Sequence, residues 1–243
     1  MKSIKLIQSF VILFFCVFSF GQTADEIINS YLEKTGGLEN WRALEATKMT
    51  AETTNEGVVI PINIYSTKDG KQAVKITYSG EEITQLAYDG KELWATNAEM
   101  LPQKADKEST ENMEKSKNDF PNPFIDYKEK GYYVDFLGTE IIDGKEAYKI
   151  MLIQEPTMYE GQKNDNISYH YFDTKSYFPI LVETKIPGEP INGQYISSEM
   201  KNYKKVKGLY FPFLLIENGN ELKITEIEIN PEIKDEVFAF PKD

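Results

Sequence analysis

Apolar and polar residues alternate along much of the chain after Met49. Val74 and Ile76 each have a polar or small neighbour, and the same period of two runs through 147–152 and 167–172. Successive side chains of a β-strand point to opposite faces of the sheet, so this period indicates strands with unlike faces. The pattern therefore predicts a mainly β (α+β) protein.

Short turn signals separate the predicted strands. Asp-Gly occurs at 69–70, 89–90 and 143–144, and Asn-Gly occurs at 218–219. These pairs favour type I′ turns, in which both central residues have positive φ, and such turns join neighbouring antiparallel strands. Hairpins at these intervals predict a curved antiparallel meander of roughly ten to twelve strands, as in a sandwich or barrel.

Near the N-terminus the apolar residues follow the helical period. Thr23 and Glu26 have the spacing of a capping box, which marks the start of a helix. Four apolar residues then fall on one helical face: Ile27, Ile28, Tyr31 and Leu32. The glycines at 36–37 are expected to end this helix, because glycine adopts the left-handed conformation without strain. A second, shorter helix is predicted over 38–44.

One long segment, 97–131, interrupts the meander. Its charged middle, 105–118, is expected to fray or to form an exposed helix. A short helix is predicted over 123–131 and is ended by Gly131. Its inward-facing residues would be Phe124, Ile125 and Tyr127. A connection of this length is usually either functional or disordered, so we interpret it as a lid.

A targeting signal is predicted at the N-terminus. Lys2 and Lys5 precede an apolar run that ends in small residues, as in a secretory signal peptide. The run is shorter than the about 20 apolar residues of a membrane span, and a retained anchor is the alternative. We therefore expect a signal peptide over 1–21, cleaved after Gly21, and a single exported domain over 22–243.

Cysteine and charge narrow the classes of function. Cys16 is the only cysteine and lies in the predicted signal, where the bulky Phe15 before it argues against lipidation. The exported chain would then have no disulfide, no catalytic thiol and no cysteine-ligated zinc. The formal net charge of −12 also makes nucleic acid an unexpected partner, because an acidic surface repels phosphate backbones.

The sequence shows little sign of catalytic chemistry. His170 is the only histidine, whereas metal sites and proton relays generally need several converging groups. Neither a Gly-x-Ser-x-Gly elbow nor a P-loop is present. We therefore expect no metal, no cofactor, no catalytic residue and no enzyme. A hydrolase with two carboxylates far apart in sequence is the remaining alternative.

Tyrosine is abundant, with 15 residues in the chain. An apolar ring with a polar tip suits a surface that is partly wet. Two interpretations are open. These rings belong either to ordinary strand packing or to a concave sheet face that holds an apolar ligand.

Six segments resemble, in order, elements of bacterial envelope proteins grouped with the outer-membrane lipoprotein-sorting carriers, the LolA/LolB-like family. They are 26–49, with its Gly-Gly-Leu-x-x-Trp element, 88–94, 124–150, 171–184, 203–213 and 224–241. The resemblance covers nearly the whole exported chain. It implies an antiparallel half-barrel, with N-terminal and mid-chain helices closing its concave side, in a Gram-negative periplasm. Carriers of this fold hold lipoprotein acyl chains between sheet and helices.

On this basis we expect a soluble, monomeric periplasmic carrier for the acyl chain of a lipid or lipoprotein, with 97–131 as its gate. An outer-membrane receptor or an inner-membrane release complex would be its partner. The alternative is an envelope interaction or sensor module whose cavity is filled by its own side chains, and a hydrolase is third. The expected ligand-lining residues are Trp94, Phe124, Tyr127, Tyr133, Met151, Tyr169, Tyr171 and Phe213.

Overall fold

The computed structural model describes residues 22–187 and 194–241. The predicted signal peptide over 1–21 lies outside the described residues. The strands are β1 (Ala46–Asn55), β2 (Val58–Thr67), β3 (Gln72–Tyr78), β4 (Glu81–Tyr88), β5 (Leu93–Thr96), β6 (Pro102–Lys104), β7 (Tyr133–Ile142), β8 (Lys145–Tyr159), β9 (Gln162–Asp173), β10 (Pro179–Lys185), β11 (Tyr195–Lys201), β12 (Lys204–Val206), β13 (Leu209–Phe211), β14 (Leu214–Glu217) and β15 (Asn220–Ile229).

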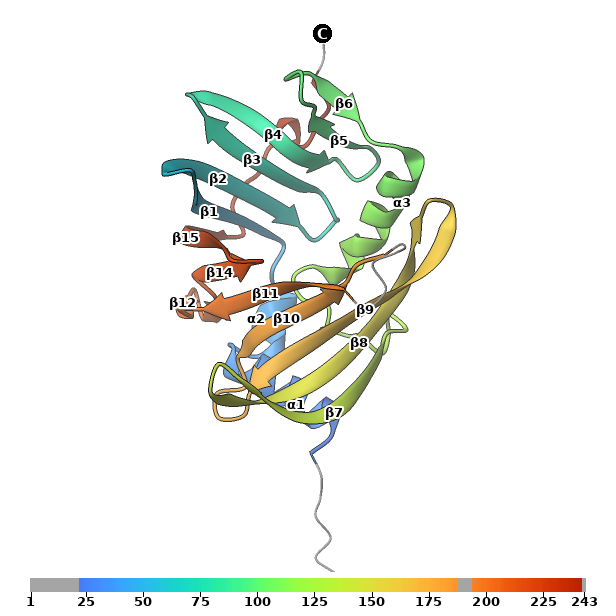
Figure 1. Cartoon of the computed structure of the whole chain (residues 1–243), viewed down its shortest axis with the longest axis vertical. Coiled ribbons are helices and arrows are strands. Elements are labelled where there is room, and N and C mark those ends of the chain that lie inside the picture. The colour runs from blue at the N-terminus through green and yellow to red at the C-terminus, as the bar shows by residue number, and fades with distance from the viewer. Residues whose placement is uncertain (1–21, 188–193, 242–243) are drawn as a thin grey trace, which may run out of the picture.

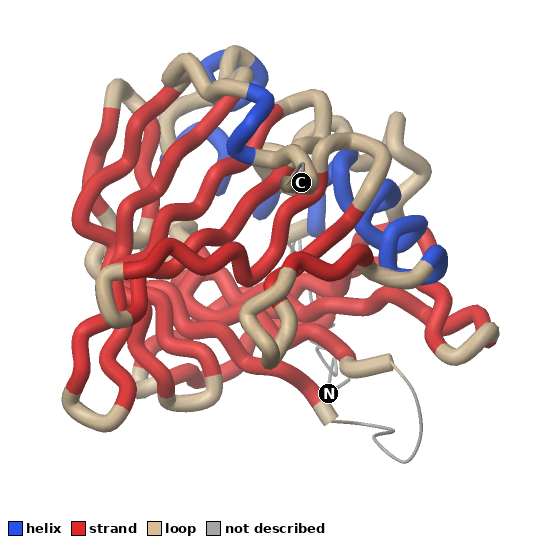
Figure 2. The backbone as a smooth tube through the Cα atoms, turned by 90° about the horizontal axis from the view of Figure 1, so that it is seen from above, coloured by secondary structure: helices blue, strands red, loops and turns tan. Residues whose placement is uncertain are grey.

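Thirteen of these strands form one sheet, in the order β6-β5-β4-β3-β2-β1-β15-β14-β11-β10-β9-β8-β7 (Figure 1). Neighbouring strands pair antiparallel, while β12 and β13 form a separate hairpin. The sheet curves without closing into a barrel, and Figure 2 shows the curved path of its strands. The predicted mainly β half-barrel is confirmed, with more strands than the roughly ten to twelve expected from hairpin spacing.

All four predicted hairpins join adjacent strands of the sheet. Asp143-Gly144 and Asn218-Gly219 have positive φ at both residues, as a type I′ turn requires. At 69–70 and 89–90 only the glycine has positive φ, so these two turns are of another type. Positive φ at both residues also occurs where the residue before the glycine is neither Asp nor Asn, for example at Glu56-Gly57. Turn geometry therefore depended on the glycine more than on an Asp or Asn before it.

The helices are α1 (Ala24–Lys34), α2 (Leu38–Arg42), α3 (Lys107–Ser116) and two 3-10 turns, η1 (Lys117–Asp119) and η2 (Asp235–Val237). The predicted capping box is present: the Thr23 N–H donates to Glu26 at 2.9 Å, and the Glu26 N–H donates to the Thr23 hydroxyl at 3.2 Å. The chain leaves α1 through Gly36 and Gly37, both at positive φ. Gly36 lies so close to Gly208 that an added Cβ would meet its carbonyl oxygen at 2.6 Å.

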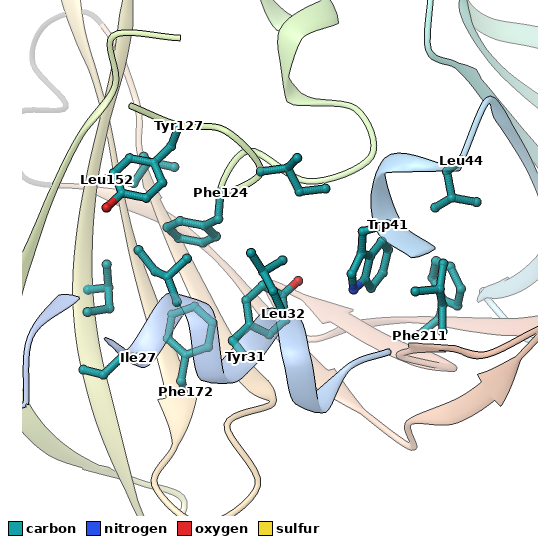
Figure 3. Packing of buried hydrophobic residues seen from close by; sticks show 14 of the residues in the cluster. Ile27, Tyr31, Leu32, Trp41, Leu44, Phe124, Tyr127, Leu152, Phe172 and Phe211 are labelled. Carbon is teal, nitrogen blue, oxygen red and sulfur yellow. The ribbon is translucent and has the colours of Figure 1, made fainter. Parts of the chain in front are cut away.

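Helix α1 packs on one face of the sheet, which we call the inner face. Its predicted apolar side, Ile27, Ile28, Tyr31 and Leu32, is buried. These residues share one core cluster with Ile150, Leu152 and Phe172 of β8 and β9 (Figure 3). Trp41 of α2 joins the same cluster and packs edge-on against Phe211, with ring centroids 5.3 Å apart. The cluster also includes Ala51 of β1 and Ile224 of β15, so this core lies against the inner face of β8 and β9 and reaches the middle of the sheet.

The segment after η1 also packs into this core. Phe124, Ile125 and Tyr127 are buried, as predicted. The short helix expected over 123–131 is wrong, because these residues form consecutive turns. Asp126 has a φ of 52°, in the left-handed region, so it cannot continue a right-handed helix.

The C-terminal segment crosses the opposite, outer face. Pairing places Ala73, Ala87 and Trp94 in one cross-strand row on this face. Phe238 covers the row, and the Trp94 indole N–H donates to the Phe238 carbonyl at 2.9 Å. This second cluster fixes the outer face of β3–β5 and leaves the inner face of the same strands uncovered by the C-terminal segment.

Candidate ligand-binding site

The inner face of β2–β4 carries a row of aliphatic side chains. Six residues form it, and we call them the aliphatic strip: Ile62, Ile64, Val74, Ile76, Ile83 and Leu86. Ile62 pairs with Ala51, a member of the main core cluster, which assigns the strip to the inner face. The remaining members follow by register, because Ile62 pairs with Ile76, Ile64 with Val74, Val74 with Leu86 and Ile76 with Ile83.

All six members of the strip are only partly buried. Five of them are β-branched, which suits extended backbone, and the sixth is Leu86. None of the six side chains has a polar atom. The flanking outer-facing positions are different: Lys75, for instance, forms an ion pair with Glu82 at 2.9 Å. The strip is therefore an apolar surface that the rest of the described chain does not fully cover.

A pocket of about 580 Å³ continues the strip at the β5–β6 edge. Its apolar side consists of Leu86, Leu93 and Ala95, and its polar side includes residues of the β5–β6 hairpin and of the first turn of α3. This volume lies in the range of about 300–1,000 Å³ that small-molecule sites occupy. Together, the strip and the pocket are the candidate site.

Polar groups at the pocket edge are held by local hydrogen bonds. Asp106 caps α3, accepting from the Ser109 N–H at 2.7 Å and from the Ser109 hydroxyl at 2.9 Å. Those bonds lower the pKa of the Asp106 carboxyl. Asn97 accepts from the backbone N–H groups of Glu99 and Leu101 within its turn. The pocket edge is therefore preorganised before any ligand arrives.

Helix α3 lies beside the pocket and contacts both β5 and β8 (Figure 1). At its N-terminal end the Glu108 carboxylate accepts from the backbone N–H groups of Glu160 and Gly161, each at 2.8 Å. One turn later the Asn112 amide bonds both the carbonyl and the N–H of Met158, at 2.7 and 2.8 Å. Because β7 pairs with β8 only as far as Ile153, Asn112 takes the place of a strand partner there.

No residue of α3 is fully buried. Its side-chain bonds to β8 come from Asn112 and from Lys115, whose ammonium donates to the Pro156 carbonyl at 2.7 Å, while Glu108 bonds the β8–β9 turn. Elements with few buried apolar contacts open locally at low free energy. Of the two outcomes expected for the middle of the 97–131 segment, fraying or an exposed helix, the structure shows a helix, over Lys107–Ser116.

The other half of the inner face is filled by aromatic side chains. Phe172 contacts Tyr31 and Phe124, with ring centroids 5.1 and 5.7 Å apart (Figure 3). His170 stands edge-on to Phe124, with ring centroids 4.7 Å apart. The Tyr31 hydroxyl accepts from the Asn122 amide. Space for a ligand on the inner face is therefore found at β2–β6, away from α1.

His170 lies inside this filled half, and its Nε2 is 2.9 Å from the Ser168 hydroxyl. Burial lowers the pKa of His170 to about 3, from the ordinary value of 6.5. An imidazole that stays neutral in an aromatic environment, beside a single hydroxyl, has no second group with which to relay a proton. Its ring packs beside Phe124 and Phe172, with centroids 4.7 and 6.4 Å away.

This histidine gives folding a pH dependence. Its folded-state pKa is lower than its unfolded value, so the stability due to neutral His170 is present above 6.5 and is lost as pH falls below 6.5. Between about pH 7.5 and 5.5 the free energy of unfolding should fall by about 1.4 kcal/mol from this group. Urea titrations of the wild type and of His170→Gln test this, and the variant should lack that decrease. Equal decreases in both proteins would contradict it.

A polar cluster lies at the far end of α3. The Asp119 carboxylate accepts from the Tyr132 hydroxyl at 3.0 Å and from the Gln154 amide at 2.8 Å. Burial raises the pKa of Asp119 and lowers the pKa of Lys130, whose ammonium lies 5.8 Å from the Tyr132 ring centroid. The bond to Gln154 ties the residues after α3 to β8, so hydrogen bonds hold the helix region at both ends.

The structure does not bring the predicted ligand-lining residues together. Met151, Tyr169 and Tyr171 lie on the outer face, because their neighbours Ile150, Leu152 and Phe172 are the ones that face the core. There, the Tyr171 hydroxyl donates to Glu183 at 2.6 Å, and the Lys149 ammonium lies 5.0 and 5.1 Å from the ring centroids of Tyr169 and Tyr171. The prediction that these three residues face inward is wrong. On each strand the residues that face inward are the adjacent ones.

Two more predicted residues are not on the inner face. Trp94 borders the pocket, but its indole packs in the outer-face cluster against Phe238 and Phe240. Tyr133 is 56% exposed and pairs with Ile153 on the outer face. A large aromatic residue in a strand was therefore an unreliable sign of a ligand surface.

The other three predicted residues are part of the protein's own packing. Phe124 and Tyr127 are buried in the main core, and Tyr127 donates its hydroxyl to Asp25. Phe213 is partly buried against the same core, with the Lys204 ammonium 4.3 Å from its ring centroid. The strip itself was missed, although its alternation at Val74 and Ile76 was visible in the sequence.

The described residues show neither a metal-binding cluster nor a membrane-spanning helix. They contain no group of three or more His, Cys, Asp or Glu side chains that could hold a metal ion. In the same residues, no helix has both the length and the apolar character needed to cross a membrane.

Comparisons with known proteins identify the fold. No family model matches the sequence, and a search of curated proteins finds no match. Among solved structures, a LolA superfamily protein from Nitrosomonas europaea is 16% identical with a TM-score of 0.53, over 90% of this chain and 98% of that one. A DUF1329 family protein from Desulfovibrio piger is 11% identical with a TM-score of 0.54, over 88% of this chain and 96% of that one.

A third structure is a domain from Vibrio parahaemolyticus named for outer membrane lipoprotein sorting. It is 12% identical with a TM-score of 0.50, over 88% of this chain and 94% of that one. The chain therefore has the LolA-like fold. This agrees with the resemblance of its sequence segments and with the order of its strands.

Proposed function

We propose that this protein is a carrier that holds a hydrocarbon chain, such as the acyl chain of a lipid or lipoprotein, against the aliphatic strip. The observation that carries the proposal is the pocket of about 580 Å³ that continues this partly exposed surface. A flexible alkyl chain matches a row of Ile, Val and Leu side chains better than a planar or charged ligand does. Binding, rather than a chemical reaction, is the activity proposed.

The energetics favour such a complex. Burying a methylene group contributes about 0.8 kcal/mol, so a long chain contributes on the order of 10 kcal/mol before the cost of ordering it. The strip has no polar side chain that would lose hydrogen bonds to water on binding. Hydrophobic burial alone is therefore sufficient for reversible retention.

Helix α3 is the proposed gate to this site. It lies beside the pocket, buries none of its own residues fully, and is attached to β8 and the β8–β9 turn by hydrogen bonds through Glu108, Asn112 and Lys115. These bonds can be exchanged for bonds to water when the helix moves away. Entry and release of a chain would follow movement of α3.

The proposed setting is the periplasm of a Gram-negative bacterium, after export by the predicted signal. An outer-membrane receptor or an inner-membrane release complex would deliver or accept the chain. The LolA-like fold supports this proposal as an analogy of architecture. The self-filled interaction module remains the competing function, because the half of the inner face below α1 is filled by its own rings.

Native mass spectrometry of the exported protein, purified without detergent, tests the proposal. A carrier should retain an adduct whose mass is that of a lipid, and the adduct should disappear after extraction with organic solvent. If protein that has been incubated with excess lipid and then desalted carries no adduct, the interaction module is favoured and the carrier function is contradicted.

The gate gives a separate prediction. Asn112→Ala removes both bonds to Met158, so amide hydrogen exchange in α3 should accelerate about tenfold, which corresponds to about 1.4 kcal/mol. Release of a bound chain should accelerate as well. Glu111→Ala, at an exposed position of the same helix, is the matched control and should change exchange about twofold or less. Equal exchange in the two variants would show that Asn112 does not hold the helix.

A further inference from the structure

The charges at the edge of the pocket bear on the kind of chain that it accepts. Lys104 is the one cationic residue among the pocket-lining residues of the described chain. It pairs with Trp94 across β5 and β6, which places its side chain on the outer face. Its ammonium bonds Glu92 at 2.8 Å and lies 5.2 Å from the Phe240 ring centroid. The positive charge of Lys104 is therefore directed away from the strip.

The first turn of α3 does not supply a positive charge either. A helix N-terminus attracts anions through its free N–H groups and its dipole. In this helix the Asp106 carboxylate already accepts from the Ser109 N–H, and Glu108 adds a second negative charge in the same turn. Lys107, next to Asp106, is 89% exposed and pairs with Glu111 one turn further on.

The groups left to meet a ligand are neutral or negative. Gln103 pairs with Ala95 on the inner side of β6 and presents a carboxamide, while Asp106 has carboxylate lone pairs beyond its two bonds to Ser109. Both can accept a hydrogen bond from a hydroxyl, an amide or an ammonium group. A carboxylate or phosphate placed here would lose water without gaining a cation.

We infer that the site selects aliphatic chains whose polar end is uncharged or cationic, and that it discriminates against fatty acids and other anionic amphiphiles. This inference rests on the proposed function. Discrimination comes from an unfavourable contact with the wrong ligand as much as from a favourable one with the right ligand. Asp106 is the specificity-determining residue, and the strip supplies affinity that is common to all chains.

Displacement of the neutral dye Nile red by amphiphiles of equal chain length tests this. Dodecan-1-ol, dodecylamine and dodecanoate are compared at about pH 8, where the amine is protonated and the carboxylate is ionised. Salt at about 0.15 M limits the effect of the acidic surface, because the Debye length is then about 8 Å. Dye binding is assigned to the strip if Ile64→Asp weakens it about 30-fold or more.

The alcohol and the amine should displace the dye at least about tenfold more strongly than the carboxylate. Asp106→Asn should lower the ratio of amine to carboxylate affinity about threefold, because asparagine keeps the helix cap but not the charge. Asp165→Asn, at an exposed position of β9, removes the same charge elsewhere and should leave the ratio unchanged.

Three results would overturn the inference. Dodecanoate binding as tightly as dodecan-1-ol would show that the pocket does not reject anions, while the carrier function would stand. Equal ratios in Asp106→Asn and Asp165→Asn would assign the preference to overall charge. If none of the amphiphiles displaces the dye, hydrocarbon binding itself fails, and the selectivity fails with it.

Discussion

Ile64→Asp is expected to weaken binding of an alkyl chain about 30-fold or more while the protein stays folded. Ile64 lies in the middle of the aliphatic strip, where it pairs with Val74 on β3 and with Met49 on β1. A carboxylate at this position is solvated when the site is empty, because the side chain is only partly buried. Covering it with a hydrocarbon chain would cost about 2 kcal/mol or more, which gives the expected loss of affinity.

Val59→Asp is the matched control for this variant. Val59 is in the same strand, is also β-branched and is 55% exposed near the β1–β2 turn. Its replacement should leave the affinity for Nile red and for dodecan-1-ol within about twofold of the wild type. Circular dichroism of both variants establishes that they are folded. Unchanged affinity in Ile64→Asp, or the same loss in both variants, would show that the strip is not the binding surface.

Tyr169→Asp provides a second comparison. From the sequence alone, Tyr169 was expected to line the cavity, so an acidic replacement would have been expected to weaken binding. Its position on the outer face, against Lys149 and Tyr195, now predicts an unchanged affinity. A loss of binding in Tyr169→Asp, with Ile64→Asp unaffected, would place the ligand on the outer face of β8–β10 instead.

Phe172→Ala should produce the largest loss of stability, about 3–5 kcal/mol in the free energy of unfolding. The Phe172 side chain has no exposed surface and contacts both Tyr31 of α1 and Phe124 of the segment after α3. Its removal therefore leaves a cavity at the point where the N-terminal helix, the segment after α3 and the sheet meet. Aromatic pairs of this geometry add about 0.5–1.5 kcal/mol to the effect of area alone.

Urea unfolding followed by circular dichroism measures this loss. Tyr159→Ala is the control, because Tyr159 is 41% exposed at the β8–β9 turn and its removal should change stability by about 0.5 kcal/mol or less. A loss below about 1 kcal/mol in Phe172→Ala would mean that α1 and the sheet do not share one core.

Local sequence signals were sufficient to predict the architecture. The capping box and the apolar side of α1 are formed by residues within one or two helical turns, so neighbouring positions specify them. Gly144 and Gly219 likewise determine their turns through their own φ angles. The segment 123–131 was mispredicted because the left-handed conformation of Asp126 depends on its surroundings, including the bidentate contact with Arg42, whose nearer bond is 2.5 Å.

The ligand surface was harder to predict than the fold. In β9, aromatic residues lie on both faces, with Phe172 inside and Tyr171 outside, so the period of two cannot show which face is concave. That choice is made by α1 and Phe124, which are far away in sequence and cover only one face. In β3 the alternation is clearer, because the aliphatic Val74 and Ile76 alternate with the small Ala73 and the charged Lys75. The sequence still does not show which face is covered, because Phe238, which covers Ala73 on the outer face, belongs to the distant C-terminal segment.

The most direct test is photo-crosslinking with an alkyl alcohol that carries a diazirine along its chain, followed by peptide mass spectrometry. The central claim is that a hydrocarbon chain lies against the inner face of β2–β4. Labelling should therefore fall on residues 62–86 and on the first turns of α3, and excess dodecan-1-ol should suppress it. Labelling confined to the outer face of β8–β10, or spread evenly over the surface and insensitive to competitor, would contradict the claim.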